Sequence, residues 1–81
     1  MPKKIYKVIQ WSSGNVGKAS IRGICNRSDL ELVGLIVSNE KKNGLDAGTL
    51  SEIDEIGVLA STNIEEVLSL DADCVNYTPL A

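Results

Sequence analysis

The sequence has 81 residues, which is enough for one small domain with a modest core. Its hydrophobic fraction of 43% is typical of a globular protein, and its net charge of −3 argues against a nucleic-acid-binding surface. The apolar run after the basic start is short and is interrupted by Lys7, so neither a signal peptide nor a membrane span is expected, and a cytoplasmic protein is predicted.

Two cysteines and the lack of histidine restrict the redox and metal chemistry. Cys25 falls on a predicted helix and Cys74 on a predicted strand. Without a secretory signal, both are expected to be reduced core residues. A metal site is not expected, because the sequence has no histidine and no closely spaced pair of cysteines.

The first predicted element is an apolar strand at residues 5–11, followed by a glycine-containing turn at residues 12–17 and then by a helical period. This order is the first unit of a dinucleotide-binding fold. The start of a helix binds phosphate because it presents unpaired backbone N–H groups and the positive end of the helix dipole. We therefore expect the cofactor to be bound by Ser12, Ser13, Gly14, Asn15, Val16 and Gly17.

The turn matches two of the three glycines in the fingerprint Gly-x-Gly-x-x-Gly. Gly14 lets the pyrophosphate approach the backbone, and Gly17 lets the helix pack closely on the strand. Ser12 replaces the first glycine and has less freedom at positive φ, so a slightly different turn is expected. A P-loop is rejected, because it requires a glycine at position 12 and a hydroxyl at position 19, which is Ala19 here. The alternative is a turn whose glycines serve geometry alone.

The helix that follows is expected to lie on the sheet through an apolar stripe of i, i+3, i+4 spacing. The stripe contains Gly17, Ser20, Ile21, Ile24 and Cys25. The residues expected to face water are Lys18, Arg22 and Asn26.

A second strand is predicted at residues 30–37, which are almost continuously apolar, as in a strand covered on both faces. Gly34 inside this strand is expected to allow the close approach of a helix. Because a helix connects the two strands, they are predicted to be parallel with a right-handed crossover.

The residues after the second strand bear on the choice of cofactor. NAD-binding domains have an acidic residue here for the ribose 2′-hydroxyl, whereas NADP-binding domains accommodate the 2′-phosphate with basic or small polar groups. The chain has Ser38 at the tip, followed by Asn39, Lys41 and Lys42. These residues favour NADP(H), while Glu40 leaves NAD(H) possible. The alternative for the lysines is a solvated loop.

The second half of the sequence predicts shorter elements. Asp46 is expected to cap a helical turn that extends through Leu50. Short strands are predicted at residues 57–60 and 74–77, with a helix at residues 64–70 between them. Two capping boxes are possible for this helix, Thr62 with Glu65 or Asn63 with Glu66. Its core face is expected to contain Ile64, Val67 and Leu68.

The order of these elements predicts the α/β class, as a Rossmann-type doubly wound parallel sheet in its N-terminal half only (β-α-β-β-α-β). A complete dinucleotide-binding domain needs about 130 residues, so residues 1–81 are expected to be the N-terminal part of a longer protein. The fourth strand should lie beside the first, with a crevice between their tips. Tyr77 and Thr78 are therefore expected to meet the nicotinamide end of the cofactor.

Three stretches resemble one enzyme family. Residues 11–17 resemble the Trp-Gly-x-Gly-Asn-Val-Gly opening of the dihydrodipicolinate reductase-like oxidoreductases, most closely the branch of 2,4-diaminopentanoate dehydrogenase and native amine dehydrogenase. Residues 45–50 resemble the Asp-Ala-Gly-x-Leu segment of dihydrodipicolinate reductase, and residues 70–77 resemble the fourth strand of the amine dehydrogenase branch. The resemblance implies NAD(P)H-dependent reduction of a C=N bond, or the reverse oxidative deamination. It also implies a separate C-terminal domain that binds substrate and mediates oligomerisation.

The leading interpretation is the NAD(P)H-binding portion of an oxidoreductase whose substrate is a small amine or imine. The alternative is a non-catalytic nucleotide-sensing module. No motif pairs a nucleophile with a base, so no catalytic residue is assigned, and the 81-residue chain alone is expected to be inactive. Proton transfer is expected from residues beyond Ala81 or from water. The expected partners are the dinucleotide, the substrate and further copies of the full-length protein, without nucleic acid or membrane.

Overall fold

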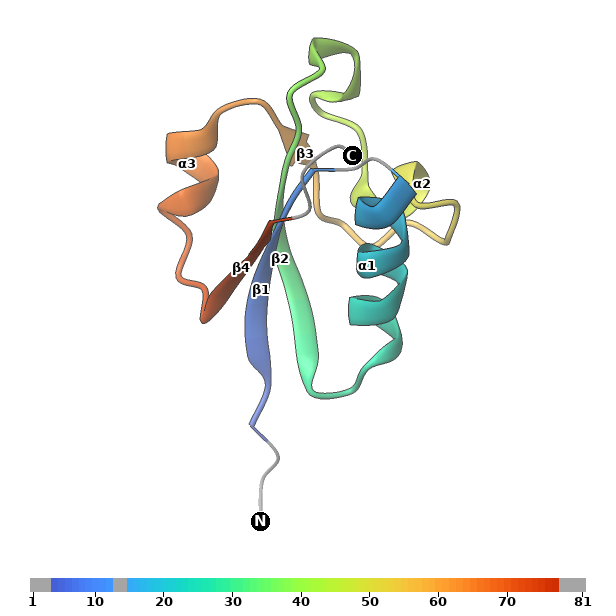
Figure 1. Cartoon of the computed structure of the whole chain (residues 1–81), viewed down its shortest axis with the longest axis vertical. Helices are drawn as coiled ribbons and strands as arrows, with labels where there is room; N and C mark the ends of the chain where they lie inside the picture. Colours follow the sequence, from blue (N-terminus) through green and yellow to red (C-terminus); the bar gives the residue numbers. More distant parts are fainter. Residues whose placement is uncertain (1–3, 13–14, 78–81) are drawn as a thin grey trace.

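A computed structural model of the chain describes residues 4–12 and 15–77 and shows a four-stranded sheet with the order β3-β2-β1-β4 (Figure 1). Every strand pair in it is parallel. The strands are β1 (Tyr6–Trp11), β2 (Leu30–Ile36), β3 (Ala60–Ser61) and β4 (Cys74–Tyr77). The helices are α1 (Asn15–Asn26), the 3-10 helix η1 (Glu40–Lys42), α2 (Ala47–Leu50) and α3 (Ile64–Leu68). The predicted fold class is therefore confirmed.

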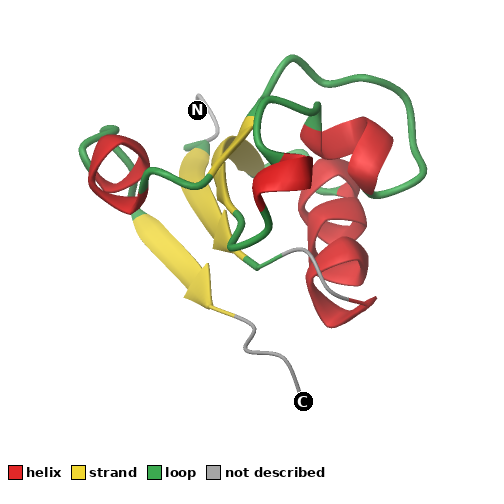
Figure 2. Ribbon diagram, turned by 90° about the horizontal axis from the view of Figure 1, so that it is seen from above, coloured by secondary structure: helices red, strands yellow, loops and turns green. Residues whose placement is uncertain are grey.

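Helices cover both faces of the sheet, as a doubly wound fold requires. Figure 2 shows α1 and α2 on one side of the strands and α3 on the other. The larger core lies under α1 and α2, and its buried residues are Val8, Ile21, Ile24, Leu32, Leu35, Val37, Ala47 and Ala60. The smaller core lies under α3, and its buried residues are Ile9, Ile36 and Val67. No helix in residues 4–12 and 15–77 has the length and apolar character that a bilayer crossing requires.

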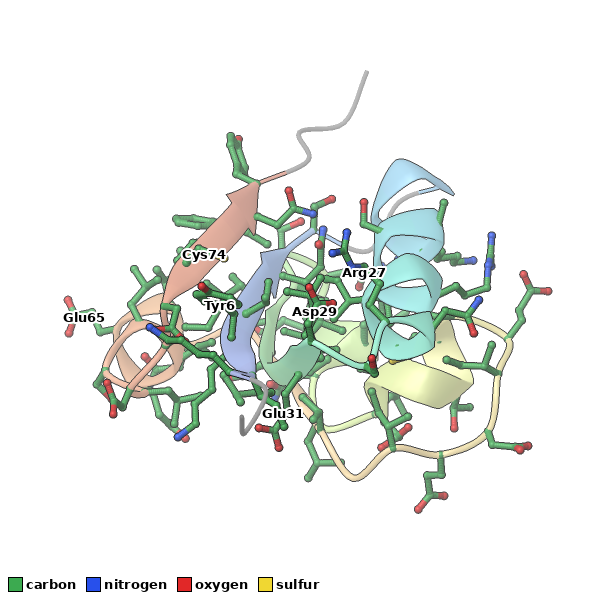
Figure 3. The ribbon with its side chains drawn as sticks, turned by 90° about the horizontal axis from the view of Figure 1, so that it is seen from below. Tyr6, Arg27, Asp29, Glu31, Glu65 and Cys74 are labelled. Carbon is green, nitrogen blue, oxygen red and sulfur yellow. The ribbon has the colours of Figure 1, made fainter. Side chains whose placement is uncertain are left out.

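The predicted packing of α1 is correct at its centre and wrong at Cys25. Ile21 and Ile24 are buried, and Ser20 is partly buried. Cys25 is exposed, because it lies one residue after Ile24 and is rotated by about 100° around the helix, away from the sheet. Cys74 is exposed as well, since β4 pairs only with β1 in the described sheet (Figure 3). Both thiols are free, but neither cysteine belongs to the core.

Gly34 allows α3 to approach β2 closely, as predicted. A Cβ at this position would lie 2.8 Å from Val67 Cγ1 and 3.1 Å from Leu70 Cδ1. The pairing of β1 with β2 also shifts at this point, because Val8 pairs with Leu32 whereas Ile9 pairs with Gly34. The smaller core is therefore built around a position without a side chain.

The predicted start of α3 is confirmed for one of the two capping boxes, but its predicted core face is mostly wrong. Asn63 is the N-cap, and its Oδ1 accepts a hydrogen bond from Glu66 N at 3.1 Å. Val67 is buried, whereas Ile64 and Leu68 are 40% and 43% exposed. The helix contains only 5 residues and contacts the sheet mainly where Gly34 makes room. A helix this short buries one side chain rather than a stripe.

The segment between β2 and β3 is organised by Asp46. As predicted, Asp46 caps α2, whose first turn donates from Gly48 N at 2.8 Å and from Thr49 N at 3.3 Å. The same carboxylate accepts from Ile56 N at 3.0 Å and Gly57 N at 2.8 Å. The strand predicted at residues 57–60 is displaced, since β3 is confined to Ala60–Ser61. One side chain thus closes the loop that carries the chain from η1 to β3.

Candidate functional site

The carboxyl ends of β1, β2 and β4 lie at one end of the sheet (Figure 1). β1 lies between β2 and β4. The connection from β1 to β2 contains α1 and covers one face of the sheet, whereas the connection from β3 to β4 contains α3 and covers the other face. Ligands of open α/β sheets bind outside the carboxyl ends of the strands, where the strand order reverses in this way. The candidate site is therefore the edge formed by the end of β1 and the adjoining ends of β2 and β4.

Ser12 comes directly after β1 and has φ of 99°, a conformation that favours glycine. Its N–H donates to Ile36 O at 2.8 Å, at the end of β2. Its carbonyl accepts a hydrogen bond from Gln10 Nε2 at 3.1 Å. The serine in the first glycine position of the fingerprint therefore has the left-handed backbone that a glycine adopts easily.

The amino end of α1 follows this segment. α1 begins at Asn15 and contains 12 residues, with Val16 and the buried Gly17 in its first turn. A helix of this length presents unpaired N–H groups and a partial positive charge at its start, so it suits an anion such as a pyrophosphate. The predicted cofactor residues Ser13, Gly14 and Thr78 lie outside the described residues.

The tips of β1 and β4 lie together, as predicted. Trp11 pairs with Tyr77 across the two strands, and their rings meet edge to face, with centroids 5.3 Å apart and an interplanar angle of 63°. Tyr77 is nonetheless 61% exposed. The aromatic pair therefore lies at the carboxyl ends of β1 and β4, beside the candidate site, and leaves much of Tyr77 exposed.

The polar residues predicted to select the cofactor lie beyond the carboxyl end of β2, at the same end of the sheet (Figure 1). Ser38 is exposed, and Asn39 caps η1 by accepting a hydrogen bond from Lys41 N at 2.9 Å. Lys41 is exposed and Lys42 is partly buried. The structure therefore brings Ser38, Asn39 and both lysines to the expected edge, with η1 fixing the backbone that carries the cations.

Sequence reasoning missed Gln10 and Asn76. Gln10 is completely buried in β1 at 0% exposure, and its Oε1 accepts a hydrogen bond from Asn76 Nδ2 on β4 at 2.8 Å. No motif contains this pair. The available signal was a lone amide in an apolar strand just before the turn, because a buried polar group needs hydrogen-bond partners.

The opposite end of the sheet is closed by an ion pair and a backbone hydrogen bond. There, Arg27 and Asp29 form an ion pair at 2.8 Å in the turn from α1 to β2, and Asp29 O accepts from Tyr6 N at 2.9 Å (Figure 3). These residues close the turn at the amino ends of β1 and β2. They lie far from the candidate site and provide a reference region for binding experiments.

Comparison with known proteins identifies the family. Residues 8–78 match the model of dihydrodipicolinate reductase, N-terminus. The chain is also 41% identical over 70 residues to a protein named amine dehydrogenase from Streptomyces virginiae. That alignment covers 85% of this chain and 19% of the relative, so the chain spans about a fifth of the length of the protein it matches. The resemblance inferred from three short stretches is thereby confirmed. The chain belongs to the dihydrodipicolinate reductase N-terminal family and is a dinucleotide-binding domain with a Rossmann-type fold.

Proposed function

We propose that this domain binds NADP(H) in preference to NAD(H), for an oxidoreductase that acts on C=N or CH–NH2 groups. The observation that carries the proposal is the left-handed backbone conformation of Ser12, which lies between the end of β1 and the start of α1. This is the point where the strand order reverses. The name of the Streptomyces virginiae relative, amine dehydrogenase, supports an amine or imine as the substrate class.

Each part of the candidate site has a role in this proposal. The segment from Ser12 to Gly17 would hold the pyrophosphate with backbone N–H groups at the start of α1. Ser38, Asn39, Lys41 and Lys42 would hold the 2′-phosphate, because ammonium groups form charge-assisted hydrogen bonds with phosphate oxygens. Tyr77, supported by Trp11, and Thr78 would lie at the nicotinamide end.

When bound, the reduced nicotinamide supplies the hydride, and the contribution of this domain is to bind and orient it. We assign no catalytic acid or base to these residues. The substrate contacts, the proton transfer and the oligomer interface are proposed to come from a further domain of a longer protein. The domain alone is therefore expected to oxidise no NADPH when it is mixed with imines.

The phosphate-binding turn is tested by the substitution Gly14→Val. A valine side chain at this position would occupy the space where the pyrophosphate approaches the backbone. The Kd for NADPH is expected to rise at least about tenfold, which is ~1.4 kcal/mol of binding free energy, with the fold retained. Titration of the reduced-nicotinamide fluorescence measures this change.

Gly23→Val is the matched control, because Gly23 lies on the exposed side of α1 and a Cβ there would meet no atom within 4 Å. It should bind NADPH as the wild type does. A folded Gly14→Val protein with wild-type affinity would remove the turn from the proposed site.

A further inference from the structure

A buried polar connection lies next to the start of the proposed dinucleotide site. Gln10 has 0% exposure, its Nε2 donates to Ser12 O at 3.1 Å, and its Oε1 accepts from Asn76 Nδ2 at 2.8 Å. Asn76 is partly buried on β4, one residue before Tyr77. The side chain of Gln10 therefore joins the first residue after β1 to the neighbouring strand.

The chemistry of the partners fixes the orientation of the Gln10 amide. A carbonyl oxygen can only accept a hydrogen bond, so the nitrogen of the amide must face Ser12 O. The oxygen of the amide is then left to accept from Asn76 Nδ2. Glutamine is suited to this position because it donates at one atom and accepts at the other.

Ser12 needs such support. A non-glycine residue persists at a positive φ only where its surroundings over-determine its conformation. The N–H of Ser12 is bonded to Ile36 of β2, and its carbonyl is bonded to Gln10 of β1, which is itself bonded to Asn76 of β4. The backbone of Ser12 is thus fastened to all three strands whose ends surround the candidate site.

We propose that Gln10 is a positioning residue for dinucleotide binding, which it promotes by holding Ser12 in the left-handed conformation. This inference rests on the proposed function. The conformation of Ser12 sets the direction in which the chain leaves β1, and so the position of the helix N–H groups relative to Tyr77 on β4. In this proposal Gln10 does not touch the dinucleotide, and it acts through the backbone of Ser12.

The test compares NADPH affinity in two backgrounds. Gln10→Met keeps the approximate length of the side chain and removes the amide, which donates from Nε2 to Ser12 O and, at 3.5 Å, to Trp11 O, and accepts at Oε1 from Asn76 Nδ2. In the wild-type background, the Kd for NADPH should rise about fivefold, as expected for the loss of one net hydrogen bond. In the Ser12→Gly background, the same substitution should raise the Kd by less than about twofold, because glycine adopts a positive φ without support.

A purely structural role for Gln10 would give equal ratios in the two backgrounds, and that result would overturn the inference. Unchanged affinity in folded Gln10→Met would overturn it as well. Arg27→Gln, which breaks the ion pair with Asp29 at the amino ends of the strands, is the control and should leave the Kd unchanged. A wild-type protein that binds no NADPH would overturn the proposed function and this inference together.

Two further variants keep the test decisive if Gln10→Met does not fold. Gln10→Leu keeps a side chain of similar bulk but removes the amide, so it should weaken NADPH binding about as much as Gln10→Met. Asn76→Leu breaks the connection at its partly buried end and should raise the Kd about twofold or more. Wild-type affinity in both variants would contradict the role of the Gln10 contacts.

Discussion

Asp46 stabilises the segment between η1 and β3 through four backbone N–H groups, which belong to Gly48, Thr49, Ile56 and Gly57. Burial opposes ionisation and by itself raises the pKa of Asp46, but the four hydrogen bonds outweigh burial and hold the pKa below its usual value. The carboxylate is therefore the form that the folded protein prefers. The Asp-Ala-Gly stretch that resembles the reductase family is, in this structure, a loop-closing device.

Asp46→Asn is expected to lower the free energy of unfolding by about 2 kcal/mol, because an amide has only one acceptor oxygen and forms no charge-assisted hydrogen bonds. The effect should also depend on pH. A depressed pKa in the folded state stabilises the protein above the unfolded pKa of about 3.9, and this stabilisation is lost as the pH falls through the folded pKa.

Urea titrations of both proteins at a series of pH values measure this effect. The difference in unfolding free energy between the wild type and Asp46→Asn should decrease as the pH drops below about 4. A difference between the two proteins that stays constant from neutral to acid pH would show that the charge of Asp46 contributes nothing to folding.

At the scale of elements, the packing of α3 on β2 depends on Gly34. Gly34→Ala would place a Cβ 2.8 Å from Val67 Cγ1, so the helix or the strand must move. The expected cost is about 1–3 kcal/mol of unfolding free energy. Gly23→Ala is the matched control, because its Cβ would meet no atom within 4 Å, and it should stabilise α1 by up to about 1 kcal/mol.

Thermal unfolding of Gly34→Ala in the Val67→Ala background tests whether the lost stability comes from a clash between the new Cβ and the side chain of Val67. Removing Cγ1 of Val67 should recover part of the stability lost by Gly34→Ala. If the costs of the two substitutions simply add, the close approach of α3 is not the reason for the glycine.

The elements that sequence predicted well are those set by local pattern. β1, β2, α1 and the caps at Asp46 and Asn63 follow from apolar periodicity and from side chains that bond within a few residues. The strand order could be predicted as well, because few topologies are open to alternating strands and helices. The resemblance then added the family.

What sequence did not predict depends on contacts between distant segments. Gln10 and Asn76 are 66 residues apart, and no local pattern links them. The exposure of Cys25 and Ile64 depends on how far each helix overlaps the sheet, which periodicity does not specify. Asp46 was predicted as a helix cap, but its bonds to residues 56 and 57 required the folded loop.

At the scale of the whole molecule, the edge of the sheet beyond β2 is expected to set the choice of cofactor. Ser38→Asp would place a carboxylate where NAD-binding domains hold the ribose 2′-hydroxyl, and it would repel a 2′-phosphate. The ratio of the Kd values for NADH and NADPH should swing toward NADH. An unchanged ratio, or a wild-type protein that binds NADH equally well or better, would contradict the assigned role of Ser38 and the lysines.

The central claim is that the dinucleotide binds at the carboxyl ends of β1, β2 and β4. Amide chemical shifts of the isotope-labelled protein, followed during titration with NADPH, test this claim most directly and detect weak binding. We predict shifts at residues 12–17, residues 38–42 and Tyr77, with Arg27 and Asp29 at the opposite end unchanged. No shift at residues 12–17, or shifts concentrated around Arg27 and Asp29, would contradict the account.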